Sequence, residues 1–282
     1  MDESTSGPSL GASPSIAAVR TALPPNYADQ ETLIAAFRAL WGPSAATRHL
    51  ESLHRAVGVG GRHLALPIAE YYALDGFAAA NKAWIRVATD LAEAAARSAL
   101  DAAGLSPQQV DHVFFVTVTG MATPSIDARL VNRLTLRPDV KRTPIFGLGC
   151  VAGAAGLSRA SDYVRAFPDE TALLLSVELC SLTLQRQDLS VANLIASGLF
   201  GDGAAAVVIR GGGCERRGPR IVATRSVFYP DTEDVMGWDM ADSGFQVVLS
   251  ARVPTVIREH IGPDVERFLA DQGLERARLR HT

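Results

Sequence analysis

The sequence predicts an α/β protein in which helices cover a layered sheet with a parallel component. Two apolar runs, residues 113–118 and 172–177, lack the polar alternation of a half-exposed strand, as expected for strands buried on both faces. Helical segments separate these runs, which is the order of elements in α/β folds. The 282 residues are 48% hydrophobic and 20% charged, so the chain is globular and long enough for about two compact units.

The N-terminal region is predicted to start as a flexible tail and to continue as helices. Residues 1–15 are small and polar, which leaves too little apolar surface to offset the entropy of ordering them. From Asp29, apolar residues recur at helical spacing until Gly42 and Pro43 end the pattern. Two more helices are expected at residues 44–57 and at the alanine-rich residues 78–103, which Gly104 follows.

Strands and helices then alternate along the chain. Strands are expected at residues 113–118, 144–146, 172–177 and 204–209, with helices at 126–134 and from Cys150 onward. Glycines at 211–213 mark a predicted boundary, which divides the ordered chain into units 16–211 and 212–282. In the second unit we expect strands at 220–225 and 245–249 and a helix at 254–272.

Charge and composition exclude several classes of function. A net charge of −3 gives no field that would favour nucleic acid or an anionic membrane surface. No apolar run approaches the ~20 residues of a membrane-spanning helix, so we expect no membrane insertion. Three cysteines without C-x-x-C spacing predict free thiols in the cytoplasm. The six histidines form no metal-binding motif, so no metal is expected.

The segment P-I-F-G-L-G-C-V-A-G-A-A-G-L, residues 144–157, is the most informative candidate site. A short strand meets glycines on both sides of Cys150 and is followed by a helix of small residues. Glycines permit a tight turn, and the start of a helix favours a thiolate over a thiol. Cys150 is therefore predicted to be an activated nucleophile with a pKa below the free value of ~8.5. The alternative is a small buried thiol.

Four other residues are weaker candidates for chemistry. Cys180 follows a strand without a glycine turn and is interpreted as a structural thiol that could line a cavity. Cys214 follows three glycines and is interpreted as an exposed bystander. Phe200, in L-F-G-D-G-A-A-A, is either a core residue or the edge of a cavity. Asp202, between glycines, is interpreted as a turn residue with no catalytic role.

Arginines are the candidates for binding phosphate, because the chain has only two lysines. Arg48 and Arg55 are seven residues apart and would share one face of the expected helix 44–57. The alternative is a solvated helix face. Gly147 and Gly149 lack the remainder of a dinucleotide-binding motif, so no nucleotide cofactor is expected.

Three sequence blocks together resemble bacterial type III polyketide synthases, which form the chalcone-synthase-like branch of the thiolase superfamily. The blocks are F-G-L-G-C-V-A-G-A-A-G around Cys150, S-V-E-L-C-S-L-T-L-Q at 176–185 and N-L-I-A-S-G-L-F-G-D-G-A-A-A-V-V at 193–208. The residues of these blocks are similar to those of family members that make alkylpyrones or alkylresorcinols. The resemblance implies a thiolase-like layered fold (α-β-α-β-α) with a complete first half, which carries the nucleophile, and an incomplete second half.

The resemblance also implies a reaction and the residues that carry it. Cys150 matches the nucleophile that accepts an acyl group from acyl-CoA, and malonyl-CoA is decarboxylated to extend that group. Phe200 matches an aromatic gate beside the nucleophile. The other matched positions are Thr123, which reaches into the partner's cavity in a homodimer, Cys180 and Thr183, which line the cavity, and Arg48 and Arg55, near the region that binds the CoA phosphates. No cofactor is implied beyond the CoA thioester substrates.

The chain departs from this family pattern at its C-terminal end. It ends at L-E-R-A-R-L-R-H-T, before the family's W-x-x-H-P-G-G block with the catalytic histidine and before a later asparagine. His281 matches a variable position instead. We therefore expect a C-terminally truncated enzyme that is impaired or inactive in condensation, because oxyanion donors are missing. The alternatives are a ketoacyl-ACP synthase III-like enzyme, which G-L-G-C-V-A-G disfavours, and a non-catalytic remnant that acts as a dimerisation partner.

Overall fold

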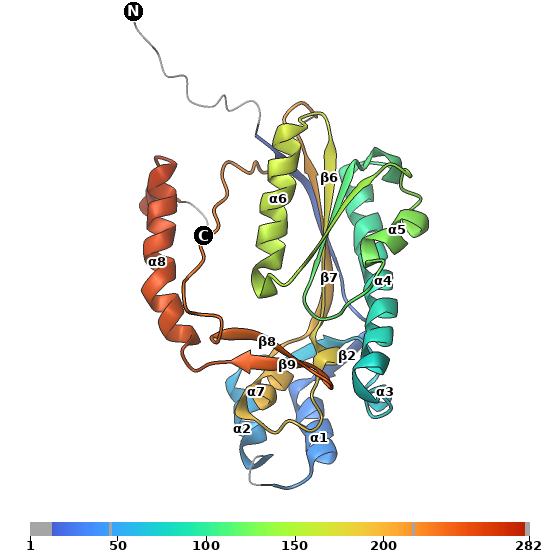
Figure 1. Ribbon diagram of the computed structural model, residues 1–282, viewed down its shortest axis with the longest axis vertical. Helices are drawn as coiled ribbons and strands as arrows, with labels where there is room; N and C mark the ends of the chain where they lie inside the picture. The colour runs from blue at the N-terminus through green and yellow to red at the C-terminus, as the bar shows by residue number, and fades with distance from the viewer. Residues whose placement is uncertain (1–12, 45–46, 216–217, 280–282) are drawn as a thin grey trace, which may run out of the picture.

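A mixed sheet of five strands is the centre of the computed structural model, which describes residues 13–44, 47–215 and 218–279 (Figure 1). The strands are ordered β1-β7-β6-β4-β5. β4 is parallel to β5 and β6, whereas β7 is antiparallel to β6 and β1. This confirms the predicted α/β class and its parallel component. The strands are β1 (Ser15–Ala22), β4 (His112–Thr117), β5 (Lys141–Phe146), β6 (Thr171–Leu179) and β7 (Asp202–Arg210).

Helices cover both faces of this sheet. α4 (Gly76–Ala103) and α5 (Ile126–Leu134) lie on one face, and α6 (Ala152–Ala166) lies on the other (Figure 1). A Cβ atom on Gly156 would lie 2.6 Å from the Leu174 side chain, so glycine lets α6 approach β6 closely. The inward face of α4 is built from small, fully buried side chains: Ala88, Ala92, Ala95, Ala96 and Ala99. In the described part of the chain, no helix is both long and apolar enough to cross a membrane.

A smaller group of elements packs at one end of the sheet and borders the candidate site (Figure 1). α1 (Gln30–Trp41) begins after Asp29, whose carboxylate accepts the Thr32 amide at 2.7 Å and caps the helix. The pairing of β2 (Asn26–Asp29) with β3 (Gly61–Leu64) forms a second, two-stranded sheet. The other elements here are the 3-10 turn η2 (Thr47–His49), α2 (Leu50–Ala56), α3 (Ile68–Tyr71), the 3-10 turn η5 (Cys180–Thr183) and α7 (Val191–Leu199).

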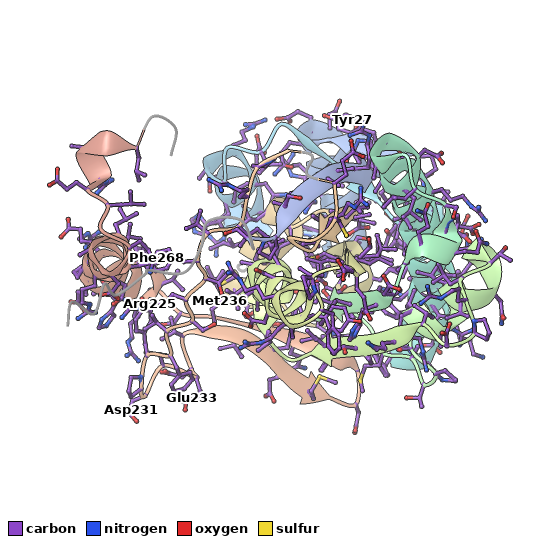
Figure 2. All side chains as sticks on the ribbon, turned by 90° about the horizontal axis from the view of Figure 1, so that it is seen from above. Tyr27, Arg225, Asp231, Glu233, Met236 and Phe268 are labelled. Atoms are coloured by element: carbon purple, nitrogen blue, oxygen red, sulfur yellow. The ribbon has the colours of Figure 1, made fainter. Side chains whose placement is uncertain are left out.

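The C-terminal part of the chain forms a hairpin and a helix that stands apart from the central sheet (Figure 1). β8 (Met236–Ala241) pairs antiparallel with β9 (Gly244–Leu249), and α8 (Val253–Asp271) follows. Figure 2, seen from above, shows the same separation of α8 from the main body. The Tyr229 hydroxyl donates to the Asp264 carboxylate at 2.5 Å, so the segment before the hairpin holds α8.

Most predicted elements are present, but three expectations from the sequence are wrong. Residues 220–225 form no strand, and Arg220 forms an isolated bridge with Ser15. The expected helix 44–57 is instead the turn η2 followed by the short helix α2. Ser15, assigned to the flexible tail, is fully buried and begins β1, whereas residues 1–12 lie outside the described residues.

Candidate active site

Cys150 lies on a glycine turn between a strand and a helix, as the sequence predicts. β5 ends at Phe146, and Gly147 and Gly149 adopt φ values of +92° and +60°, a region that side chains rarely allow. Cys150 then lies in the 3-10 turn η4 (Gly149–Val151), directly before α6. The residue is exposed. The turn therefore presents a thiol at the N-terminal end of α6.

The pKa of Cys150 departs from the expected direction. Neighbouring atoms remove part of the water around the thiol and raise its pKa, and the negative charge of Glu178 raises it further. A hydrogen bond from the backbone of Cys150 lowers the pKa but does not offset these effects. Desolvation has the largest effect on the pKa of Cys150, because it makes the charged thiolate less favourable than the neutral thiol. The prediction of a pKa below the free value is therefore wrong.

Glu178 is the charged group at this site that the sequence reasoning missed. It lies near the end of β6, where its carboxylate accepts the Thr119 hydroxyl at 2.7 Å and the Val118 amide at 3.1 Å. Burial raises the pKa of Glu178 to about 7, and these hydrogen bonds offset only part of that effect. The signal in the sequence that could have identified Glu178 is that it is the one charged residue of the strand T-A-L-L-L-S-V-E-L.

Replacing Glu178 by glutamine is expected to make Cys150 more reactive. Above about pH 7 the Glu178 carboxylate is mostly ionised, and its charge disfavours the thiolate. Removing that charge lowers the pKa of Cys150, and one pKa unit changes the thiolate population up to about tenfold. We expect iodoacetamide to alkylate Cys150 about 3- to 10-fold faster in Glu178→Gln than in the wild type at about pH 8. Below about pH 6, where Glu178 is neutral, the difference is expected to shrink.

The control for this experiment is Glu170→Gln. It removes a carboxylate that pairs with Lys141 at 3.3 Å, on a different part of the surface. We expect this variant to leave the alkylation rate of Cys150 unchanged. Peptide mapping by mass spectrometry identifies the alkylated residue in each case. An equal or slower rate in Glu178→Gln would contradict the electrostatic role of the carboxylate.

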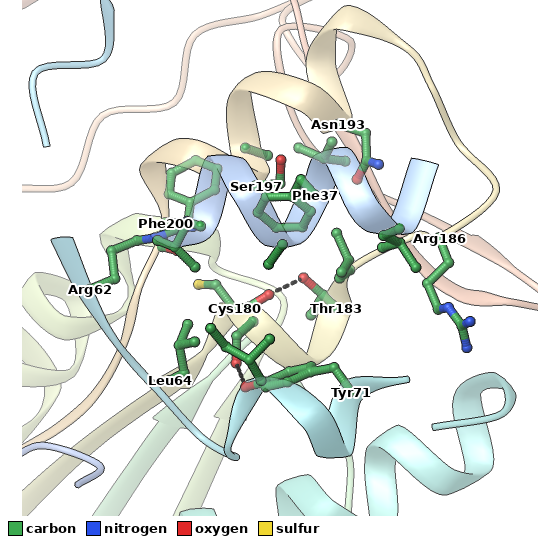
Figure 3. A pocket seen from close by; sticks show the side chains of 18 of the residues that line it. Phe37, Arg62, Leu64, Tyr71, Cys180, Thr183, Arg186, Asn193, Ser197 and Phe200 are labelled. Atoms are coloured by element: carbon green, nitrogen blue, oxygen red, sulfur yellow. Dashed lines mark hydrogen bonds between the residues drawn. The ribbon is translucent and has the colours of Figure 1, made fainter. Parts of the chain in front are cut away.

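Phe200, Cys180 and Thr183 line one pocket (Figure 3). The Thr183 hydroxyl donates to the Cys180 carbonyl at 2.8 Å, which stabilises the turn η5 in the pocket wall. Apolar side chains from α1, β3, α7 and β9 supply much of the remaining wall: Leu33, Phe37, Leu40, Leu64, Ala196 and Val247. Such a lining is suited to a hydrocarbon group.

Cys150 is not among the residues that line this pocket. Burial raises the pKa of Cys180, and the charges of Asp202, Glu178 and Cys150 raise it further. Cys180, in the pocket wall, is therefore a less readily ionised thiol than Cys150.

A second, larger cavity adjoins the apolar pocket. Its volume is about 810 Å³, and it shares Tyr71, Ser181 and Thr183 with the wall of the first. Thr119, which donates to the carboxylate of Glu178, also lines this cavity. Its volume is in the range of small-molecule sites, ~300–1,000 Å³. The site thus has an apolar compartment and a more polar one side by side.

The remaining predicted site residues lie elsewhere on the surface. Thr123 is exposed in the loop between β4 and α5, outside the set that lines the apolar pocket. Arg48 lies in η2 and Arg55 in α2, so they do not share one helix as expected. Arg55 donates to the Glu31 carboxylate at 3.0 and 2.9 Å and also pairs with Glu51. These carboxylates compensate much of the charge that Arg55 would offer to a phosphate.

Two residues given little weight in the sequence have different surroundings from those expected. Cys214 is half-buried rather than exposed, with its sulfur 3.8 Å from the Pro168 carbonyl. Asp202 is buried, begins the strand β7 and accepts the backbone amides of Ala65 and Ser181, so its interpretation as a turn residue is wrong. Over the residues that the structure describes, no group of three or more His, Cys, Asp or Glu side chains is placed to hold a metal ion. His281 lies outside them.

Comparison with known proteins assigns these features to a family. A family model, "Chalcone and stilbene synthases, N-terminal domain", matches residues 73–213, the part of the chain that carries Cys150, Cys180, Thr183 and Phe200. The chain belongs to the chalcone and stilbene synthase family. This confirms the resemblance inferred from the three sequence blocks, and it favours this family over the ketoacyl-ACP synthase III alternative.

Bacterial members of the chalcone and stilbene synthase family match most of the chain. It is 54% identical to 1,3,6,8-tetrahydroxynaphthalene synthase of Streptomyces peucetius subsp. caesius over 92% of the chain and 70% of the relative. It is 36% identical to the enzyme of that name from Streptomyces coelicolor, over 79% of the chain and 59% of the relative. Phloroglucinol synthase of Pseudomonas fluorescens is 35% identical, over 78% of the chain and 66% of the relative. The chain thus spans between 59% and 70% of the lengths of these relatives.

A solved structure of this family has the same fold. The crystal structure of 1,3,6,8-tetrahydroxynaphthalene synthase from Streptomyces coelicolor, described as a bacterial type III polyketide synthase, matches with a TM-score of 0.88 and 31% identity. The match covers 94% of this chain and 75% of that one. The chain therefore has the thiolase-like α/β fold of the type III polyketide synthases, as the sequence predicts.

Proposed function

We propose that this chain carries the acyl-loading site of a type III polyketide synthase. Cys150 would accept an acyl group from acyl-CoA, and malonyl-CoA would supply the units that extend it. The observation that carries this proposal is the position of Cys150, on a glycine turn at the start of α6, with its thiol exposed. Family membership supports the same reaction class.

The chemistry of the proposed reaction has two steps. In the first, the Cys150 thiolate attacks the thioester carbonyl of acyl-CoA, so that a new C–S bond forms and the CoA thiol leaves. In the second, malonyl-CoA loses CO2, and the resulting enolate carbon attacks the carbonyl of the Cys150 thioester. A C–C bond forms, the C–S bond to Cys150 breaks, and the thiolate returns while the extended chain stays on CoA.

We assign Phe200, Cys180 and Thr183 to the walls that receive the acyl chain. Their common pocket is mainly apolar, which supports an alkyl starter and hence an alkylpyrone or alkylresorcinol product. The names of the relatives, 1,3,6,8-tetrahydroxynaphthalene synthase and phloroglucinol synthase, support hydroxylated aromatic products as the alternative. Which starter is used decides between these products.

Arg48 and Arg55 remain our proposal for contacts with the CoA phosphates. Both are exposed near the pocket end of the fold, which supports this role. For Arg55 the ion pairs with Glu31 and Glu51 would have to be exchanged for the phosphate. Free thiols and CoA thioester substrates support a cytoplasmic location.

We propose that the enzyme is a homodimer in which Thr123 of one copy faces the cavity of the other. β5 is one of the two edge strands of the central sheet and, in the part of the chain that the structure describes, pairs with β4 alone, so it offers unpaired backbone groups. Next to it, Phe146, Leu148 and Val151 are 43–59% exposed, which is a large apolar surface beside the nucleophile. Sedimentation analysis of the purified chain tests this assembly.

The experiment that tests the proposed function separates loading from condensation. The purified chain is incubated with palmitoyl-CoA and malonyl-CoA labelled in its free carboxyl group, and release of labelled CO2 and formation of products are followed. We expect an acyl thioester on Cys150, and a Phe200→Ala variant should release CO2 about tenfold more slowly because the aromatic wall is lost. Products from malonyl-CoA alone would favour the aromatic alternative.

The same assay covers the remaining expectations from the sequence. Loading without CO2 release would support the expected impairment of condensation. A chain that forms dimers but neither an acyl thioester nor CO2 would support the non-catalytic alternative and contradict the proposed function.

A further inference from the structure

A network of buried polar groups supports the apolar pocket, and the proposed reaction does not use it. Asp202 is the first residue of β7, two positions after Phe200, and is only 6% exposed. One oxygen of its carboxylate accepts the Ser181 amide at 2.8 Å. The other accepts the Ala65 amide at 2.5 Å and the Ser181 hydroxyl. Three donors from two distant segments therefore converge on one carboxylate.

Tyr71 extends this network to the segment that follows β3. Its hydroxyl lies 2.5 Å from the Ser181 hydroxyl and accepts the Leu66 amide at 3.2 Å. The network thus ties residues 65–71 to the turn η5, which carries Cys180 and Thr183 in the pocket wall. Neither segment is hydrogen-bonded to the other through the backbone ladder of a sheet, so these side chains set the spacing between them.

Arg62 is a second buried charge on the other side of Phe200. It is 6% exposed, and its Nη1 donates to the Phe200 carbonyl at 2.9 Å. The charge of Asp202 raises the pKa of Arg62, although burial lowers that pKa to about 10 overall. The two charges therefore compensate each other across the pocket wall. Figure 3 shows Arg62 beside Phe200 at one end of the pocket, with Tyr71 and Cys180 below them in this view.

We propose that Asp202 and Arg62 are positioning residues for the acyl pocket, which together hold Phe200 and the Cys180–Thr183 turn at the spacing that the acyl chain requires. Asp202 holds the turn through Ser181, and Arg62 holds the backbone of Phe200. This inference rests on the proposed function for the identity of the ligand. The restraint itself rests on the hydrogen bonds alone.

The Asp202→Asn variant tests this role most directly. Asparagine has nearly the shape of aspartate, but its NH2 group donates, so only its carbonyl oxygen can accept the backbone and hydroxyl donors that meet there. At least one buried donor would lose its partner, and the turn η5 would move or open. The change therefore acts on the restraint without removing volume from the core.

Asp127→Asn is a matched control. Asp127 is also buried, with an exposed fraction of 0%, and it accepts Arg142 at 2.8 Å. It lies in α5 and does not line the apolar pocket. Both substitutions should lower the thermal unfolding temperature, because each removes a buried acceptor. Only the substitution at position 202 should change the pocket.

Two readouts are taken at a temperature at which both variants are folded. The first is labelling of Cys180 by N-ethylmaleimide, which does not depend on any activity. We expect Asp202→Asn to label about tenfold faster than the wild type, because the turn opens, and Asp127→Asn to label at the wild-type rate. The second is the Kd for palmitoyl-CoA, which should rise about tenfold in Asp202→Asn only.

Each outcome decides a specific point. Equal Cys180 labelling in the two variants would overturn the positioning role, whether or not palmitoyl-CoA binds. Faster labelling of Cys180 with an unchanged Kd for palmitoyl-CoA would show a structural restraint that the ligand does not need. This result would also overturn the positioning role. If the wild type does not bind palmitoyl-CoA, the proposed starter is wrong, and labelling alone decides whether Asp202 restrains the turn.

A second pair of variants covers the case in which Asp202→Asn does not fold. Arg62→Lys keeps a donor within reach of the Phe200 carbonyl, whereas Arg62→Met keeps the stem and removes the donor. We expect Arg62→Met to show the faster Cys180 labelling and Arg62→Lys to restore most of the wild-type behaviour. If Cys180 is labelled at the wild-type rate in both Arg62→Met and Arg62→Lys, the proposed role of Arg62 is contradicted.

Discussion

The Cys150→Ala variant is expected to lose covalent acyl transfer by more than about 10²-fold. The exposed thiol on the glycine turn is the proposed acceptor of the acyl group, and alanine has no nucleophile. Cys180 is a poor substitute because burial raises the pKa of its thiol, so little thiolate is present near neutral pH. Incubation with radiolabelled palmitoyl-CoA, followed by protein precipitation and peptide mapping, measures the acyl thioester.

The matched control for this variant is Cys214→Ala. Cys214 is half-buried against the Pro168 carbonyl, and removal of its thiol should leave the labelling of Cys150 unchanged. Circular dichroism confirms that both variants are folded. Retention of the label in Cys150→Ala, or its loss in Cys214→Ala, would place the acyl group on a different residue and contradict the assignment of the nucleophile.

The sequence predicts the central elements of the fold because their patterns are local. The strand at residues 113–118 and the helix at 126–134 are found within one or two residues of their predicted bounds. Apolar runs without polar alternation belong to strands buried on both faces, which β4 is. The edge strand β1 is missed because its sequence, S-I-A-A-V-R-T-A, has small and polar residues and only two of its eight positions are buried.

The candidate site is predicted in part. The glycine turn around Cys150 is visible in the sequence because positive φ values require glycine at fixed positions. The direction of the pKa shift of Cys150 is not, since it depends first on burial and then on Glu178, which is 28 positions away in the chain and on β6, separated from β5 by β4. The pattern of residues along the chain carries no information on which charges meet in space.

Asp202 illustrates the same limit for structural roles. In G-D-G the local pattern indicates a turn, but Asp202 is the first residue of the strand β7. The function of the carboxylate lies in its contacts with Ala65 and Ser181, which are 137 and 21 positions away. Likewise, the exposed arginines Arg48 and Arg55 are plausible phosphate ligands in the sequence, but the ion pairs of Arg55 appear only in the structure.

Trp84→Ala is expected to have the largest effect on stability, a loss of about 3–5 kcal/mol of the free energy of unfolding. Trp84 lies in α4 and is 1% exposed, so truncation leaves a large cavity between the helix and the sheet. Its indole N–H also donates to the Thr119 hydroxyl at 3.3 Å, and Thr119 in turn donates to Glu178. The thermal midpoint should fall on the order of 10 °C, measured by differential scanning calorimetry.

Two further variants separate the causes of this loss. Trp238→Ala removes the same side chain from β8, where it is half-buried, and should cost far less because water already reaches it. Trp84→Phe keeps most of the ring volume but removes the N–H donor to Thr119, so it should recover most of the lost stability if packing is the main cause. Equal falls in the thermal midpoint for Trp84→Ala and Trp238→Ala would show that the core between α4 and the sheet does not dominate stability. If the thermal midpoint falls as far in Trp84→Phe as in Trp84→Ala, the effect is due to the hydrogen bonds that lead through Thr119 to Glu178. The alkylation rate of Cys150 in Trp84→Phe should then change as well.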